Sequence, residues 1–139
     1  MTNPTQITSL RIPTETLTAA RTLTEADSGK TFLLDLAGGF TVTMPPVAKA
    51  GNGFHVNFII KTASAGYVIT EDATVDANVM TGGNTSAAVS GAANASAAFT
   101  QINFTAGQAI AGDSASITSN GVRYYTRCHS NVVAGCTLT

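Results

Sequence analysis

The chain has 139 residues, a length typical of a single domain, and its formal net charge is −1. Its seven Lys and Arg and eight Asp and Glu make up 11% of the residues, against about 25% in ordinary globular proteins. The cations are scattered along the chain, and no apolar run approaches the roughly 20 residues of a membrane span. The composition therefore argues against a nucleic-acid-binding protein and against a transmembrane helix.

The low charge has two explanations that the sequence leaves open. Thr-rich strands can present a neutral polar surface, or other protein can cover much of the surface.

Residues 1–13 are predicted to form an extended N-terminal arm, and residues 14–139 a β-rich domain. The arm is polar but carries three spaced aliphatic residues, Ile7, Leu10 and Ile12. Such an arm is suited to contacting a partner by adding a strand to its sheet edge. A frayed terminus is the alternative.

The next segment, residues 14–23, fits a strand because of its threonines and a helix because of its Ala-Ala-Arg, and we favour the strand. Thr24 is followed three residues later by Asp27, which indicates the start of a helical turn. Gly29 is suited to ending that turn with a positive φ.

Two strands are predicted at residues 30–36 and 40–44, where Phe40, Val42 and Met44 alternate with threonines. Gly38-Gly39 lies between them, so the pattern predicts a β-hairpin on which the core is built. Pro45 and Pro46 end the second strand, because proline has no N–H to donate.

Residues 54–62 give the strongest strand pattern of the chain, and residues 67–70 are predicted to return as a second hairpin. A loop is expected at residues 47–53. Residues 81–98 are almost all small, which fits either a flexible surface loop or close packing at a symmetry axis.

A third hairpin is predicted from residues 114–119 and 122–129, joined by Asn120-Gly121 as a type I′ turn. Residues 136–139 close the chain as a short strand. The many short strands and the scarcity of helix predict an all-β single domain: an antiparallel β-sandwich, or a barrel-like, jelly-roll-like fold.

Several of these segments carry a resemblance to a known class of protein. The residues concerned are Leu23, Thr24, Ala26 to Phe32, Leu34, Phe40 to Thr43 and Pro45, followed by the strand Phe54–Lys61, by Gly112-Asp113, and by Asn120-Gly121 with Tyr124-Tyr125. This pattern resembles small virion structural proteins of tailed bacteriophages, usually called capsid decoration, cement or head proteins. Those proteins often have a Trp just before the final Tyr, whereas this chain has no Trp.

The resemblance implies a β-rich shell protein, most simply a homotrimer, on the exterior of the virion. Its expected partners are copies of itself and the phage major capsid protein, which it would bind on the outer surface and stabilise. No nucleic acid, membrane or cofactor is expected. The N-terminus lacks the charged and apolar regions of a signal peptide, so synthesis in the host cytoplasm is expected.

Cys128 and Cys136 lie on the two flanking strands of a predicted terminal hairpin, where they can face each other. They can form a disulfide if their Cα atoms are about 5.5 Å apart; reduced, half-buried thiols are the alternative. His129 beside Cys128 offers a weak metal-ligand pattern without an evident fourth ligand. We expect no metal site there.

No arrangement of residues predicts an enzyme. His55 stands alone in a strand, and the aspartates lie near turns, where they cap local backbone. Glu71-Asp72 with Asp76 lacks the spacing of a calcium loop. The alternative function is a receptor- or glycan-binding module of a phage fibre or tail, which would use exposed tyrosines. A small hydrolase is the weakest hypothesis.

Overall fold

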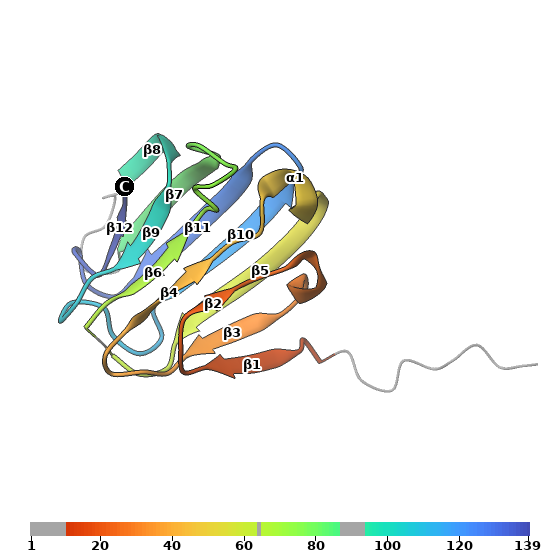
Figure 1. Cartoon of the computed structure of the whole chain (residues 1–139). Coiled ribbons are helices and arrows are strands. Elements are labelled where there is room, and N and C mark those ends of the chain that lie inside the picture. The colour runs from red at the N-terminus through yellow and green to blue at the C-terminus, as the bar shows by residue number, and fades with distance from the viewer. Residues whose placement is uncertain (1–10, 64, 87–93) are drawn as a thin grey trace, which may run out of the picture.

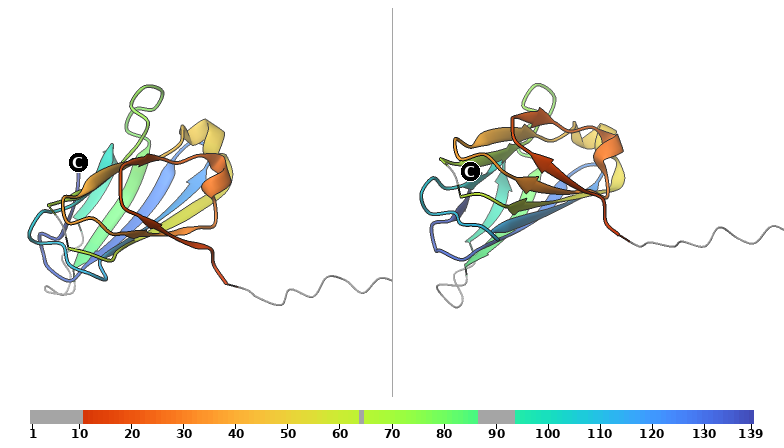
Figure 2. Two further views of the ribbon diagram at one scale, coloured as in Figure 1. Left: turned by 60° about the horizontal axis from the view of Figure 1, so that its bottom comes forward. Right: turned by 90° about the horizontal axis from the view of Figure 1, so that it is seen from below.

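The computed structural model describes residues 11–63, 65–86 and 94–139, and they form two β-sheets that face each other (Figures 1 and 2). Sheet A contains, in spatial order, β1 (Thr14–Leu17), β3 (Thr31–Leu34), β5 (Asn52–Ile60), β10 (Ser114–Asn120), β11 (Tyr124–Ser130), β7 (Met80–Ser86) and β8 (Asn94–Phe99). Sheet B contains β12 (Cys136–Leu138), β9 (Gln101–Phe104), β6 (Tyr67–Thr70), β4 (Phe40–Thr43) and β2 (Arg21–Thr22). Single helical turns are η1 (Glu25–Asp27) and α1 (Val47–Ala50).

The first half of the chain winds as a coil between the two sheets. Strands β1, β3 and β5 pair in parallel in sheet A, and β2, β4 and β6 pair in parallel in sheet B. Consecutive strands therefore belong to opposite sheets, as in a β-solenoid. The second half completes both sheets mainly with antiparallel pairs, although β7 lies parallel to β11. The prediction of an all-β sandwich is confirmed, but the sheets are mixed where antiparallel pairing was expected.

The core lies between the sheets and follows from strand alternation. Residues along β11 are alternately buried and exposed, because every second side chain of a strand points to the interior. Phe32 of β3 stacks on Phe58 of β5 with ring centroids 5.6 Å apart. Tyr67 from sheet B is fully buried, and its hydroxyl group lies 2.8 Å from the carbonyl of Thr62.

The first two predicted hairpins are wrong. Strands β3 and β4 do not pair, since β3 belongs to sheet A and β4 to sheet B, and β5 and β6 are separated in the same way. The link at Gly38-Gly39 is a crossover between sheets. Gly39 has φ +70°, and a Cβ there would lie 1.9 Å from the carbonyl oxygen of Gly66, so the link requires glycine for close packing.

The third hairpin is confirmed as β10–β11, with Ser119 opposite Tyr124. Its turn is not type I′, however. Among the described residues only Asn78 and glycines have positive φ, and a type I′ turn needs positive φ at Asn120. The side-chain oxygen of Asn120 instead accepts hydrogen bonds from the backbone N–H groups of Val122 and Arg123, at 2.9 and 2.8 Å.

Four other predictions have different outcomes in the structure. The strand expected at residues 14–23 is divided into β1 and β2, which belong to different sheets. The helical turn is confirmed as η1, with Gly29 at φ +86°. The loop expected at residues 47–53 contains α1 and the start of β5. The flexible loop expected at residues 81–98 is wrong for its described part, because this segment supplies β7 and β8.

The connections gather at two ends of the sandwich (Figure 1). We call the end formed by residues 35–39, 105–113 and 131–135 the loop end. The opposite end, which we call the helix end, is formed by α1, residues 71–79 and residues 121–123.

Candidate functional site

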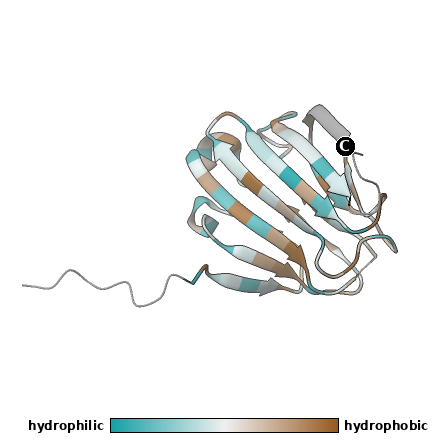
Figure 3. Ribbon diagram, turned by 180° about the vertical axis from the view of Figure 1, so that it is seen from behind, coloured by the Kyte–Doolittle hydropathy of each residue, from teal (hydrophilic) through white to brown (hydrophobic). Residues whose placement is uncertain are grey.

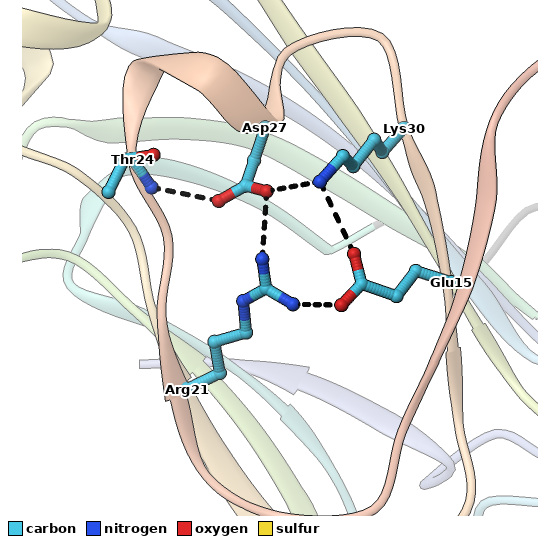
Figure 4. Close-up of polar contacts among 5 residues, drawn as sticks. All are labelled: Glu15, Arg21, Thr24, Asp27 and Lys30. Atoms are coloured by element: carbon cyan, nitrogen blue, oxygen red, sulfur yellow. Dashed lines mark hydrogen bonds and ion pairs between the residues drawn. The ribbon is translucent and has the colours of Figure 1, made fainter.

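A cluster of four ionised side chains joins the edge strands of the two sheets (Figure 4). Arg21 of β2 pairs with Glu15 of β1 and, at 2.9 Å, with Asp27 of η1. Lys30 pairs with Asp27 at 2.7 Å and with Glu15 at 3.3 Å. Because β1 and β2 are edge strands of different sheets, the cluster links the sheets along an open side of the sandwich.

The electrostatics of the cluster favour ionised carboxylates. Burial alone would raise the pKa of Asp27, but hydrogen bonds from Lys30 and from the N–H of Thr24, together with the charge of Arg21, lower it overall. For Glu15, burial likewise raises the pKa, and the bonds from Arg21 and Lys30 outweigh that effect and lower it. The two cations and two carboxylates of the cluster neutralise one another, as in a structural ion-pair network.

The same two cations also cover the core. The guanidinium carbon of Arg21 lies 5.5 Å from the centroid of the Phe32 ring, and the Lys30 ammonium nitrogen lies 6.0 Å from it. Both distances are within reach of a cation–π contact. The cluster thus seals the ring of Phe32, which has no exposed surface.

Other acidic residues hold loops in place, as the turn interpretation predicted. Asp113 is fully buried, and its carboxylate accepts hydrogen bonds from the N–H groups of Ile110 and Asn131, at 3.0 and 2.8 Å. Glu71 accepts from the N–H groups of Asn78 and Val79, at 2.9 Å each. These bonds make the loops at both ends of the sandwich well defined.

Asp72 and Asp76, which were weighed with Glu71 as calcium ligands, also accept hydrogen bonds from protein groups. Asp72 accepts hydrogen bonds from the N–H and the hydroxyl of Thr74, at 3.0 and 2.6 Å. Asp76 accepts from the N–H of Val47 at 2.8 Å. Within the described residues no group of three or more His, Cys, Asp and Glu could hold a metal ion.

The two histidines do not form a common site, and neither does His129 with the adjacent Cys128. His55 is exposed on β5, where its Nδ1 lies 3.1 Å from the carbonyl of Gly53. His129 is exposed on the outer face of β11, with Nδ1 3.3 Å from the hydroxyl of Thr85. Cys128 points to the interior, because neighbouring residues of a strand face opposite sides.

Cys128 and Cys136 lie inside the sandwich and both are fully buried as free thiols. The predicted terminal hairpin is wrong, since β11 belongs to sheet A and β12 to sheet B. The cysteines nevertheless face each other across the core: a hydrogen bond with Cys136, and then burial, raise the pKa of the Cys128 thiol. Asn84, which pairs with Cys128, donates a 2.6 Å hydrogen bond to the Cys136 carbonyl. The disulfide remains a prediction.

The arm residues are only partly placed. Ile7 and Leu10 lie outside the described residues, and Ile12 is 60% exposed just before β1. Its contact with a partner remains a prediction.

The outer face of sheet A contains a shallow depression of about 360 Å³, lined by Ser116, Thr118, Tyr125, Thr126 and Arg127. Figure 3 looks onto this face, where hydrophilic and hydrophobic residues alternate along the strands. Tyr125 is 50% exposed, whereas Tyr67 and Tyr124, the other two tyrosines, are buried in the core.

A second surface feature is the loop end. Leu36, Ile110 and Val133 come from three different loops there and are 39%, 42% and 50% exposed. Asp35, which precedes Leu36 in the chain, forms an ion pair of 2.6 Å with Lys61. The loop end therefore exposes three aliphatic side chains, and its Asp35 is neutralised by an ion pair.

Neither the depression nor the ionised cluster was predicted from the sequence, although each had a signal. The alternation of Tyr125, Arg127 and His129 in one strand would have placed them on one face. The ionised cluster was signalled by the crowding of Glu15, Arg21, Asp27 and Lys30 within a chain that has few charges.

Comparisons of the chain with protein-family models, with curated proteins and with solved structures find no match. Within the residues that the structure describes, no helix has the length and apolar character needed to cross a membrane.

Proposed function

We propose that the chain is a capsid decoration protein of a tailed bacteriophage, which binds the outer surface of the major capsid protein shell through its loop end and stabilises the shell. The resemblance of residues 23–46 and of the β10–β11 region to such virion proteins supports this function, as does the all-β fold. A homotrimer is the simplest assembly. No reaction is part of this proposal.

The observation that carries the proposal is the composition of the loop end. The cores of protein interfaces are depleted of charged residues, and apolar side chains there lose water on binding. Leu36, Ile110 and Val133 supply such side chains, and Asp35 is neutralised by its ion pair with Lys61.

The loops that carry these residues are already tied together in the isolated chain. The N–H of Thr105 donates to the carbonyl of Gly135 at 3.0 Å, and Asp113 joins the segments of Ile110 and Asn131. Such preorganisation favours binding because little conformational entropy is lost on association. Each copy need contribute only modest affinity, since the contact is repeated over the whole shell.

The test is co-sedimentation of the purified protein with capsids that lack it. Ile110→Asp and Val133→Asp are expected to weaken binding by about tenfold or more each, because each places a charge in a desolvated contact. Val75→Asp and Val122→Asp are matched controls at the helix end, where those valines are 67% and 69% exposed. The controls are expected to bind as the wild type does.

Two outcomes would contradict the proposal. One is equal loss of binding from the variants at both ends. The other is a wild-type protein that runs as a strict monomer of 14.1 kDa in size-exclusion chromatography with light scattering and never sediments with capsids.

A further inference from the structure

The depression on the outer face of sheet A arises from side-chain size. Ser116 and Thr118 of β10 form its floor, and the longer side chains of Tyr125 and Arg127 stand beside them on β11. On the other side of β10, Asn57 of β5 pairs with Ser116. Its volume of about 360 Å³ lies at the lower end of the range for small-ligand sites, roughly 300–1,000 Å³.

Several polar groups around the depression have no partner in the part of the chain that the structure describes. Among the described residues, none makes a hydrogen bond or ion pair with the side chains of Ser116, Thr118, Asn57 or Arg127. Two hydroxyls and one guanidinium therefore line the depression with free hydrogen-bonding capacity, and the Asn57 amide lies on the neighbouring strand. This set can both donate and accept, which matches a ligand rich in hydroxyl groups.

Tyr125 supplies the apolar part of the depression. Its hydroxyl accepts a hydrogen bond of 3.2 Å from the side-chain amide of Asn120, which holds the ring in place. A half-exposed aromatic ring held in this way offers a flat apolar surface beside polar groups, and it loses little entropy when a ligand covers it.

The charges of the strands around the depression indicate which class of ligand it can bind. Strands β5, β7, β10 and β11 contain no Asp or Glu, and Arg127 is their only Lys or Arg. A guanidinium without a carboxylate partner is complementary to an anion, and its planar fork fits a carboxylate with two parallel hydrogen bonds.

We propose that this depression binds one unit of an acidic saccharide, a uronic-acid-type sugar. The sugar carboxylate pairs with Arg127, the sugar ring covers Tyr125, and the sugar hydroxyls bond to Ser116 and Thr118. The site goes beyond capsid binding, because it lies on the outer face of sheet A, away from the loop end.

The experiment is a nuclear magnetic resonance titration of the full chain with an oligogalacturonate. Its methyl-esterified form is the neutral analogue, and an oligo-aspartate peptide and inorganic phosphate are the other anions. Chemical-shift changes are expected at residues 116–118 and 125–127. The methyl ester is expected to bind about tenfold more weakly or worse, as the loss of a charge-assisted bidentate contact requires.

Variants make the test specific. Arg127→Gln and Tyr125→Ala are each expected to weaken oligogalacturonate binding by about tenfold, with unchanged thermal unfolding midpoints because both residues are exposed. Arg123→Gln is the matched control, since Arg123 lies on the same hairpin but outside the depression. Arg127→Gln is also expected to co-sediment normally with capsids, so that failure of this proposal and of capsid binding are distinguishable.

Four results would overturn the proposal: no binding of the oligogalacturonate at millimolar concentration; equal binding of the methyl ester; equal or tighter binding of the oligo-aspartate peptide or of phosphate; or equal effects of the Arg123 and Arg127 substitutions.

Discussion

Asp27 is the residue on which the ionised cluster depends. Its side chain is 5% exposed and accepts from Arg21, Lys30 and the N–H of Thr24. A buried carboxylate with this many donors is stable only while all of them remain, and the two cations would repel each other without it. The cluster therefore ties the sheet edges to η1 in one cooperative unit.

Asp27→Asn tests this role. The variant removes the charge while keeping the size of the side chain, so the free energy of unfolding is expected to fall by about 1–2 kcal/mol in urea denaturation. Glu25→Gln, on the same helical turn but exposed and outside the cluster, is the control and should change the value by less than about 0.5 kcal/mol. Equal stability of Asp27→Asn and the wild type would contradict the role of the cluster.

Acid should weaken the same contacts. The folded-state pKa of Asp27 is below its unfolded value, so its ionised form stabilises the fold above about pH 4, and this contribution is lost as the pH falls below that value. The stability difference between wild type and Asp27→Asn is therefore expected to shrink between neutral pH and about pH 2.5, measured by urea denaturation. A difference that stays constant with pH would argue against the ionic origin of the effect.

At the scale of elements, the close approach of β7 to β11 depends on Gly82. This residue has φ +145°, and a Cβ there would lie 1.9 Å from the carbonyl oxygen of Thr126. Gly82→Ala is expected to destabilise the protein by about 2–4 kcal/mol, through backbone strain and overpacking.

The control for Gly82→Ala is Gly38→Ala, where an added Cβ meets nothing within 4 Å. Thermal unfolding of both variants checks the prediction. Similar midpoints for the two would mean that β7 does not need glycine at this position.

The facing strands β11 and β12 make the disulfide a specific prediction. Oxidised glutathione is expected to oxidise Cys128 and Cys136 to a disulfide. The two thiols lose two protons and two electrons, and the glutathione disulfide takes them up to give two glutathione thiols. Because the closed loop is short, stabilisation of about 2–3 kcal/mol is expected. Intact mass should fall by two hydrogens in the wild type and not in Cys136→Ala. Two thiols that remain alkylatable after unfolding of the treated protein would refute it.

Sequence patterns predicted where most strands lie but not which strands pair. The alternation in Phe40–Thr43 and in Phe54–Lys61 marks buried faces correctly, because burial of every second residue is a local property. A glycine-containing link fits a hairpin and a crossover between sheets equally well. Whether the link forms a hairpin or a crossover depends on which strands pair, as when Phe32 lies opposite Phe58, and such partners are distant in sequence.

The features of the candidate site also divide into those that a local sequence pattern predicts and those that depend on distant contacts. The opposite orientations of Cys128 and His129 follow from strand alternation alone, and so does the outward position of Arg127. The approach of Cys128 to Cys136, and of Arg21 to Glu15, requires the two sheets to be stacked. Sequence patterns within one strand contain no information about that stacking.

At the scale of the whole molecule, the coil of β1 to β6 and the later strands give the protein two surfaces of different character. The loop end exposes three aliphatic side chains and is proposed to face the shell. The outer face of sheet A is polar, carries the depression beside Tyr125, and is proposed to stay open to solvent and bind a sugar. Separate surfaces of this kind allow one small domain to bind a lattice and a second ligand at the same time.

The most direct test of the central claim is cryo-electron microscopy of phage particles with and without this protein. Extra density is expected on the outside of the shell at three-fold positions, with the loop end against the major capsid protein and sheet A outward. Shells of identical density in the two samples, or density confined to the tail or a fibre, would contradict it.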